Sequence, residues 1–202
     1  MGISIRDSSG SDARTGSSTS SDPDKADSLA DYANFLRNVR RDYDRAEAMY
    51  ERAITADPNH AHGLGWYADF LENVRRDYDR AEAMYERAIT ADPNHAYSLG
   101  CYANFLRNVR RDYDRAEAMY ERAITADPNY AHSIGNYAWF LKDVRRDYGR
   151  AEAMYERAIT ADPNHAYSLG CYANFLKDVR RDYDRAEAMY ERAITADPNH
   201  GQ

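Results

Sequence analysis

Apolar side chains recur at steps of three and four residues along most of the chain. Between residues 57 and 91 they form two series, Leu64, Tyr67, Ala68, Phe70, Leu71 and Val74, followed by Ala81, Met84, Tyr85, Ala88 and Ile89. These steps place each series on one face of an α-helix. The pattern therefore predicts two amphipathic helices in close succession, which form a helical hairpin.

The hairpin pattern repeats with a strict period of 35 residues. The stretch RAEAMYERAITADPN occurs five times without a change, beginning at Arg45, Arg80, Arg115, Arg150 and Arg185. A fixed period of roughly 20 to 50 residues is typical of a stacked array, in which each unit covers the apolar face of its neighbour. We therefore predict an all-α solenoid of five helix-turn-helix units, about ten helices, over residues 22–197. Units one to five are residues 22–56, 57–91, 92–126, 127–161 and 162–196.

The two ends of the sequence do not follow the repeat. Residues 1–21 are rich in Ser, Thr, Gly and Asp and contain no aromatic side chain. Such a segment buries too little apolar surface to offset the entropy lost on ordering, so we expect a flexible tail. A docking or modification arm is the alternative for this segment. Residues 198–202 are a short C-terminal stub.

Acidic residues and prolines mark the expected helix boundaries. Asp79 and Glu82 have the spacing of a capping box, which predicts that Asp79 caps the second helix of unit two. Unit four has Gly149 at the same place, and Gly is only slightly weaker as a cap. Asp92 followed by Pro93 is typical of a cap and the first helical residue, so we expect the next helix to begin there.

Large and small residues follow one another in a fixed order in every unit. In unit two the first helix has Leu64, Tyr67, Ala68 and Leu71, and the second has Ala81, Tyr85, Ala88 and then Pro93. This series resembles the tetratricopeptide repeat (TPR) family over residues 22–197. The resemblance implies a right-handed solenoid, whose first helices line a concave groove that holds an extended peptide.

Two features depart from the usual TPR pattern. The 35-residue period is one residue longer than usual, and the turn Arg75, Arg76, Asp77, Tyr78 lacks the Gly that commonly precedes Asp. A secondary similarity is to the half-a-TPR (HAT) repeats of RNA-processing scaffolds, on the residues Trp66, Tyr67, Ala68, Arg80, Ala81, Tyr85, Glu86, Arg87 and Ala88. An RNA-processing scaffold is therefore one of the functional alternatives.

The charge pattern bears on nucleic acid as a partner. The net charge of −7 makes nucleic acid unfavourable as a partner of the whole chain. Arg pairs such as Arg75 and Arg76 recur in every unit, and they would align as a basic edge along which phosphates could lie. We favour a structural role, in which each pair ends the first helix and meets the adjacent acid, such as Asp77.

The sequence predicts a non-enzyme with no cofactor and no metal site, because repeated residue pairs do not form one special site. Glu47 and Glu51 are interpreted as part of a solvated acidic stripe, which Arg45 and Arg52 of the same or adjacent units neutralise. Exposed rings are expected for the histidines that follow the Asp-Pro-Asn turns, His60, His95, His165 and His200. His60 and His62 point to different helix faces, which makes them a poor metal pair.

Cys101 and Cys171 occupy the same place in units three and five. Stacking at about 10 Å per repeat would hold them roughly 20 Å apart, whereas a disulfide needs Cα atoms within about 7 Å. We expect free thiols, which suit a reducing compartment. Because the sequence shows no secretory signal and no apolar membrane span, we expect a cytoplasmic location and no membrane partner.

Variation between units is concentrated in the first helices, which the TPR resemblance places on the groove. Asn104 and Asn108, four residues apart, can donate to and accept from a peptide backbone, and Trp139 is an expected anchor. The predicted partner-binding residues are Asn34, Asn38, His62, Trp66, Asp69, Asn73, Tyr97, Asn104, Asn108, His132, Trp139, Tyr167 and Asn174. Solvated or packing roles are the alternative for these residues. We predict a scaffold that binds a protein or peptide.

One TPR binding mode is missing from this sequence. Chaperone-binding TPR proteins clamp a terminal carboxylate with Lys and Arg on the groove wall. Here one of those positions is held by Gly65, Gly100, Gly135 and Gly170. We therefore do not expect binding of acidic chaperone tails.

The ends of the array predict a second function, self-association. No polar capping helix follows unit five, so part of its apolar face lacks cover, and unit one keeps the internal apolar pattern. The predicted self-association residues are Tyr32, Phe35 and Leu36 at one end and Met189, Tyr190, Ala193 and Ile194 at the other. Head-to-tail stacking does not close into a symmetric dimer, and it would build oligomers or filaments. Against this, Asp27 and Asp31 resemble a partial solvent cap.

Overall fold

The computed structural model describes residues 22–197, which form ten α-helices and five short π-helical turns. The first helices of the units are α1 (Pro23–Phe35), α3 (Ala61–Phe70), α5 (Ala96–Phe105), α7 (Ala131–Phe140) and α9 (Ala166–Phe175). The second helices are α2 (Tyr43–Ala56), α4 (Tyr78–Ala91), α6 (Tyr113–Ala126), α8 (Tyr148–Ala161) and α10 (Tyr183–Ala196). The π-helical turns η1 to η5 are Leu36–Arg40, Leu71–Arg75, Leu106–Arg110, Leu141–Arg145 and Leu176–Arg180. The segments interpreted as a tail (1–21) and a stub (198–202) lie outside the described residues.

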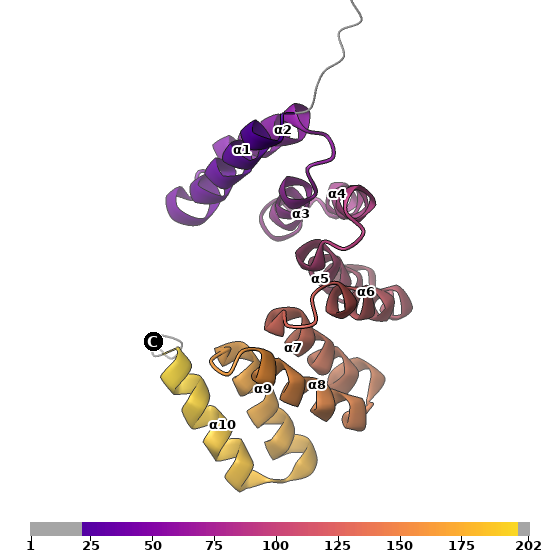
Figure 1. Cartoon of the computed structure of the whole chain (residues 1–202), viewed down its shortest axis with the longest axis vertical. Coiled ribbons are helices and arrows are strands. Elements are labelled where there is room, and N and C mark those ends of the chain that lie inside the picture. The colour runs from indigo at the N-terminus through magenta and orange to yellow at the C-terminus, as the bar shows by residue number, and fades with distance from the viewer. Residues whose placement is uncertain (1–21, 198–202) are drawn as a thin grey trace, which may run out of the picture.

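The helices are arranged as the repeat predicts. Each first helix packs against the second helix of its own unit and against the first helices of the neighbouring units. The units follow an arc, with α3, α5 and α7 toward its inner side and α4, α6 and α8 toward its outer side (Figure 1). Because residues 22–197 contain no strand, the predicted all-α solenoid of five hairpins is confirmed.

A row of buried aromatic side chains joins each unit to the next. Tyr85 of α4 is fully buried, and its ring centroid lies 5.5 Å from that of Tyr102 and 5.7 Å from that of Phe105 in the following unit. The small residues Ala81 and Ala88 on the same helix are also fully buried. Each unit thus completes its core with its neighbour, as expected for a stacked array.

The turn between the two helices of a unit explains the long period. The π-helical turn Leu71–Arg75 ends α3, and the amides of Arg76 and Asp77 both donate to Leu71 O. A π turn inserts one residue into an α-helix, which accounts for the extra residue in each unit. Arg76 then adopts a left-handed conformation, with φ 58° and ψ 27°, at the position that usually carries Gly. The other four units repeat this conformation at Arg41, Arg111, Arg146 and Arg181.

The predicted cap of the second helix is wrong by two residues. Asp77 caps α4, because its carboxylate accepts the amide of Arg80 at 3.2 Å, and Asp79 lies in the first turn. In unit four Asp147 caps α8 in the same way, so Gly149 is not a cap. The left-handed residue before the cap redirects the chain, so the helix starts earlier than the Asp-x-x-Glu spacing indicated.

The predicted start of the next helix at Asp-Pro is wrong in the internal units. Asp92 ends α4, its carboxylate accepts the amide of Asn94 at 2.9 Å, and α5 starts only at Ala96. In unit one, by contrast, Asp22 caps α1 and Pro23 is its first residue. The Asp-Pro-Asn segment is therefore a turn between helices wherever another unit precedes it.

Glycine brings consecutive first helices close together. A Cβ atom at Gly65 would lie 2.3 Å from Ser98 Oγ, and one at Gly135 would lie 2.4 Å from Ser168 Oγ. Both serines are fully buried. These glycines occupy one position of the missing carboxylate clamp, and the structure gives them a packing role.

Candidate functional site

The inner wall of the arc carries a hollow of 370 Å³ built from four units. Its lining residues are Asp69, Glu72, Asn73, Tyr85, Tyr97, Cys101, Asn104, Arg107, Asn108, His132, Asn136 and Tyr167. The predicted partner-binding residues among them are Asp69, Asn73, Tyr97, Asn104, Asn108, His132 and Tyr167. We call this the inner-wall hollow.

The remaining predicted partner-binding residues do not line the hollow. They are Asn34, Asn38, His62, Trp66, Trp139 and Asn174. Trp66 packs partly against the core, and its ring centroid lies 3.8 Å from that of His62. Trp139 lies beneath the Arg107 guanidinium, at 4.4 Å from the ring centroid. Both tryptophans thus have intramolecular contacts on the first helices.

The asparagines of the wall have a structural contact that the sequence did not reveal. Asn104 Oδ1 accepts a hydrogen bond of 2.6 Å from the hydroxyl of the buried Tyr120 on the second helix. Asn34 accepts in the same way from Tyr50 at 2.7 Å, and Asn174 from Tyr190 at 2.6 Å. A buried hydroxyl needs such a partner. The amide oxygen of each of these side chains is therefore engaged within the protein.

Units two and four lack this asparagine. In unit two Asp69 stands at the position, and the Tyr85 hydroxyl donates instead to Glu72 at 2.9 Å. In unit four Trp139 stands there, and the buried hydroxyl of Tyr155 has no partner in the described part of the chain. Ser133 Oγ of unit four is also buried without a partner among residues 22–197. The residues that each unit carries on the inner wall therefore determine whether its buried tyrosine hydroxyl has a hydrogen-bond acceptor.

The hollow combines an anionic and a cationic side. Burial raises the pKa of Glu72 to about 7, and the hydrogen bond from Tyr85 opposes this shift. Arg107 donates from Nε to Asn108 Oδ1 at 2.8 Å, while its buried Nη1 has no hydrogen-bond partner in the region that the structure describes. Asp69 is paired with Arg37 at 2.6 Å. Glu72 and Arg107 are therefore the two groups of the hollow with incomplete charge compensation.

The histidines that follow the inter-unit turns are not exposed, so that prediction is wrong where the structure describes them. The His60 side chain is 12% exposed, and Nε2 lies 2.8 Å from Asp27 Oδ1. The rings of His95 and His165 contact Ser98 and Ser168 through Nδ1, at 2.8 Å and 2.7 Å. His200 lies outside the described residues. These rings help to hold the ends of the first helices.

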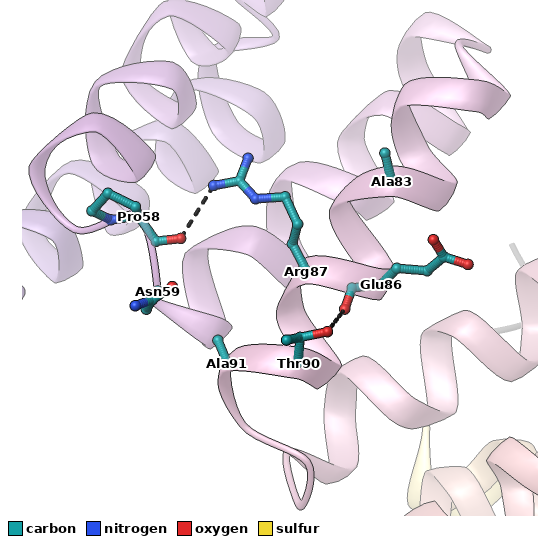
Figure 2. Close-up of a pocket in the computed structure, with 7 residues that line it drawn as sticks. All are labelled: Pro58, Asn59, Ala83, Glu86, Arg87, Thr90 and Ala91. Atoms are coloured by element: carbon teal, nitrogen blue, oxygen red, sulfur yellow. Dashed lines mark hydrogen bonds between the residues drawn. The ribbon is translucent and has the colours of Figure 1, made fainter.

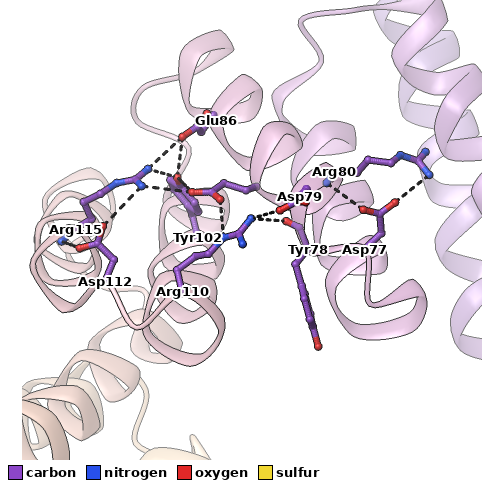
Figure 3. Close-up of polar contacts among 10 residues, drawn as sticks. Asp77, Tyr78, Asp79, Arg80, Glu86, Tyr102, Arg110, Asp112 and Arg115 are labelled. Atoms are coloured by element: carbon purple, nitrogen blue, oxygen red, sulfur yellow. Dashed lines mark hydrogen bonds and ion pairs between the residues drawn. The ribbon is translucent and has the colours of Figure 1, made fainter.

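The repeated arginines and acids form a network between units. Glu47 and Glu51 are neutralised from the adjacent unit as expected, by Arg80, which is in phase with Arg45. The predicted pairing of each Arg pair with the adjacent acid is wrong, since Arg75 binds Asp44 and Glu47 and not Asp77. Arg110 binds Asp79 at 2.6 Å and Glu82 at 2.7 Å on the preceding unit, while Arg115 binds Glu82, Glu86 and the Tyr102 hydroxyl (Figure 3). We call this arrangement the junction network. The equivalent ion pairs occur at Arg75 and Arg80, Arg145 and Arg150, and Arg180 and Arg185. In each pair of adjacent arginines in units two to five, such as Arg75 and Arg76, the first arginine is thus neutralised by acids of the preceding unit.

The outer side carries larger but structural crevices. Pro58, Asn59, Ala83, Glu86, Arg87, Thr90 and Ala91 line a hollow of 640 Å³ (Figure 2). Arg87 spans it and donates to Pro58 O at 3.1 Å. The same contact joins Arg122 to Pro93 and Arg192 to Pro163. Because these residues are the same in every unit, the crevice has no feature that distinguishes one unit from another.

The sequence missed several residues of the inner-wall hollow, namely Glu72, Tyr85, Cys101, Arg107 and Asn136. Tyr85 belongs to a second helix. Because the second helices are nearly the same in every unit, the sequence indicated only a packing role for this residue. Glu72 and Arg107 occupy the same repeat position as Lys142 and Lys177, and this change of charge was the available signal. Both cysteines are free thiols, as expected.

The comparisons with known proteins agree with this architecture. The sequence model described as tetratricopeptide repeat matches residues 39–96, 74–131 and 141–200, so the chain belongs to the tetratricopeptide repeat family. No curated protein matches the chain. Within residues 22–197, no helix is both long and apolar enough to cross a bilayer.

Solved TPR structures share the fold. PilF of Pseudomonas aeruginosa is similar with a TM-score of 0.75 and 19% identity, over 89% of this chain and 78% of that chain. TTC0263, a thermophilic TPR protein of Thermus thermophilus, has a TM-score of 0.71 and 17% identity, over 87% and 93%. YrrB, a TPR protein with an unusual peptide-binding site, has a TM-score of 0.57 and 21% identity, over 85% and 86%. At these identities the likeness shows the shared fold.

Proposed function

We propose that this protein is a non-catalytic scaffold that binds an extended protein segment along the inner wall of units two to five. TPR proteins in general bind protein partners, and one structural relative is described as having a peptide-binding site. The observation that carries the proposal is the inner-wall hollow, which gathers predicted partner-binding residues from four first helices. Elsewhere on the array the units present nearly the same side chains.

The amide groups of the wall indicate how a backbone would be held. With Oδ1 occupied by Tyr120, Asn104 presents its Nδ2 donors, which suit a peptide carbonyl. Such contacts are independent of the side chains of the bound segment, so sequence preference would come from the Glu72 and Arg107 sides of the hollow. An extended peptide with an acidic residue opposite Arg107 is the favoured occupant.

The test separates the donor role of Asn104 from its support of Tyr120. Peptides are first selected from a random display library against the full chain, and their affinities are then measured by fluorescence anisotropy. Asn104→Asp keeps an oxygen for Tyr120 but removes the Nδ2 donors, and we expect at least about tenfold weaker binding. Asn94→Asp in an inter-unit turn is the matched control and should bind normally. Unchanged binding by Asn104→Asp, with helicity preserved in both variants, would place the site elsewhere.

The alternatives use other surfaces. Head-to-tail self-association would use the two ends of the solenoid and is independent of the groove. An RNA-processing scaffold is less favoured, because the first arginine of each Arg pair in units two to five is paired with acids, as Arg75 is with Asp44 and Glu47. Steeply salt-dependent RNA binding that disappears with Arg75→Ala would restore that alternative.

A further inference from the structure

Each internal junction repeats the same set of contacts. At the junction of units two and three, Arg110 and Arg115 bind Asp79, Glu82 and Glu86 (Figure 3). Tyr102 also stacks on the buried Tyr85. The sequence keeps these residues in phase over five units. Unit one and unit five carry the residues that are in phase with the two sides of such a junction. The two ends of the array should therefore be the halves of one further junction.

The first half of that junction is already in place on unit one. Arg45 Nη2 donates to the Tyr32 hydroxyl at 2.7 Å, as Arg115 does to Tyr102 inside the array. The rings of Tyr32 and Phe35 stack at 6.4 Å, and Arg40 lies 5.7 Å from the Phe35 centroid. Internally the corresponding distances are 6.2 Å for Tyr102 and Phe105 and 5.5 Å for Arg110 over Phe105. We call Ser28, Tyr32, Phe35, Arg40 and Arg45 the N-terminal end surface.

The second half lies on unit five. Asp184, Glu187 and Glu191 are in phase with Asp79, Glu82 and Glu86, and all three are exposed. In the part of the chain that the structure describes, no arginine pairs with them, whereas Glu82 binds both Arg110 and Arg115. Gly170, Asp184, Glu187, Tyr190 and Glu191 form the C-terminal end surface. The charges at the positions in phase with the junction network are therefore opposite on the two end surfaces, while Asp27 and Asp31 are exposed beside the arginines at the N-terminal end.

The exposed aromatic rings and the glycine positions at the two ends also match an internal junction. Tyr32 is 40% exposed and Phe35 43%, whereas the equivalent Tyr102 and Phe105 are 1% and 0% exposed. A Cβ atom at Gly170 would meet nothing within 4 Å, although Gly65, Gly100 and Gly135 each receive a serine of the next unit. Ser28 is the residue in phase with those serines. Among the predicted self-association residues, Leu36 is only 1% exposed and belongs to the core, so it adds no surface.

We propose that a second copy of this chain docks head to tail, with the C-terminal end surface of one copy against the N-terminal end surface of the next, in the register of an internal junction. Arg45 of one copy then meets Glu187 and Glu191 of the other, Arg40 meets Asp184 and Glu187, and Ser28 lies over Gly170. The Tyr190 ring stacks on Tyr32 and Phe35. Because the two surfaces differ, the assembly is open and grows by one copy at a time. The buried rings supply the affinity, and the exposed ion pairs mainly fix the register.

The test is sedimentation of the full chain over about 1 to 500 μM in low salt. The weight-average mass should rise from 23.2 kDa past that of two copies without a plateau. Arg45→Glu and Glu187→Arg should each shift this rise at least about tenfold to higher concentration, because like charges then face each other. Thr125→Glu, an exposed charge change on α6, is the matched control and should assemble normally.

A charge swap decides whether the register is the proposed one. Combining Arg45→Glu with Glu187→Arg in one chain restores opposite charges across the junction, so assembly should recover toward the parent. A strict monomer over the whole range would overturn the proposal, as would a plateau at two copies. Single reversals that assemble normally, or a double variant that remains as weak as the single ones, would also overturn it, provided that circular dichroism shows unchanged helicity.

Discussion

Units three and four have nearly the same second helix but satisfy their buried hydroxyls differently. In unit three Asn104 accepts from Tyr120, and His95 contacts Ser98. In unit four Trp139 and Tyr130 stand at those two positions, and the hydroxyls of Tyr155 and Ser133 are buried without partners in the described residues. Such groups each cost about 1 to 3 kcal/mol. Unit four thus gives up stability at two positions where its residues differ from those of unit three.

Unit two differs from both, because the group that accepts from its buried tyrosine is a buried carboxyl group, Glu72. The pKa of Glu72 is raised by burial to about 7, so the folded state holds a proton that the unfolded state releases above its ordinary pKa of 4.5. Stability should therefore fall as pH rises from about 4.5 through about 7, and stay level above. Glu72→Gln should remove this loss and stabilise the protein by roughly 2 kcal/mol at pH 8. Urea unfolding at pH 5 and pH 8 measures the effect, and an equal gain at both values would contradict it.

Removing the acceptor of unit three tests the hydroxyl contact directly. Asn104→Leu leaves the Tyr120 hydroxyl buried and unpaired, and we expect a loss of about 1 to 3 kcal/mol. The matched change Asn38→Leu, at the exposed position of unit one in phase with Asn108, should cost less than about 0.5 kcal/mol. Denaturant midpoints compare the two variants, and equal losses would remove the special role of Asn104.

Removing the hydroxyl itself should have opposite signs in the two units. Tyr120→Phe deletes a satisfied group and should destabilise by about 1 kcal/mol, whereas Tyr155→Phe deletes an unsatisfied one and should stabilise by a similar amount. Thermal unfolding of both variants gives the comparison. A loss of the same size in both units would mean that the Tyr155 hydroxyl has a partner.

The smallest expected effect concerns Ser133, the second unpaired hydroxyl of unit four. Tyr130→His places the ring of units three and five beside Ser133, and a contact like that of His95 with Ser98 should stabilise by about 0.5 to 1 kcal/mol. Differential scanning calorimetry can resolve this gain. Its absence would show that Ser133 is already satisfied.

The sequence was sufficient for the fold because one apolar pattern recurs five times in phase. It was not sufficient for the helix ends, since Asp77 and Asp79 are both plausible caps until the left-handed Arg76 directs the chain. It also could not show that Asn104 supports Tyr120, or that burial raises the pKa of Glu72. Both depend on contacts between helices that no local spacing encodes. Seven of the predicted partner-binding residues line the inner-wall hollow, and their binding roles are still proposals.

The most direct test of the central claim, that the inner wall is the partner-binding surface, uses the two tryptophans. Trp66 and Trp139 both lie on first helices, so their two indole N–H signals in an NMR spectrum report on that wall. When a selected peptide is titrated into the full chain, the Trp139 signal should shift together with the side-chain amide of Asn108, while the amide of Asn94 in an inter-unit turn stays in place. Shifts confined to the outer helices α4, α6 and α8, with both indole signals unmoved, would contradict the account.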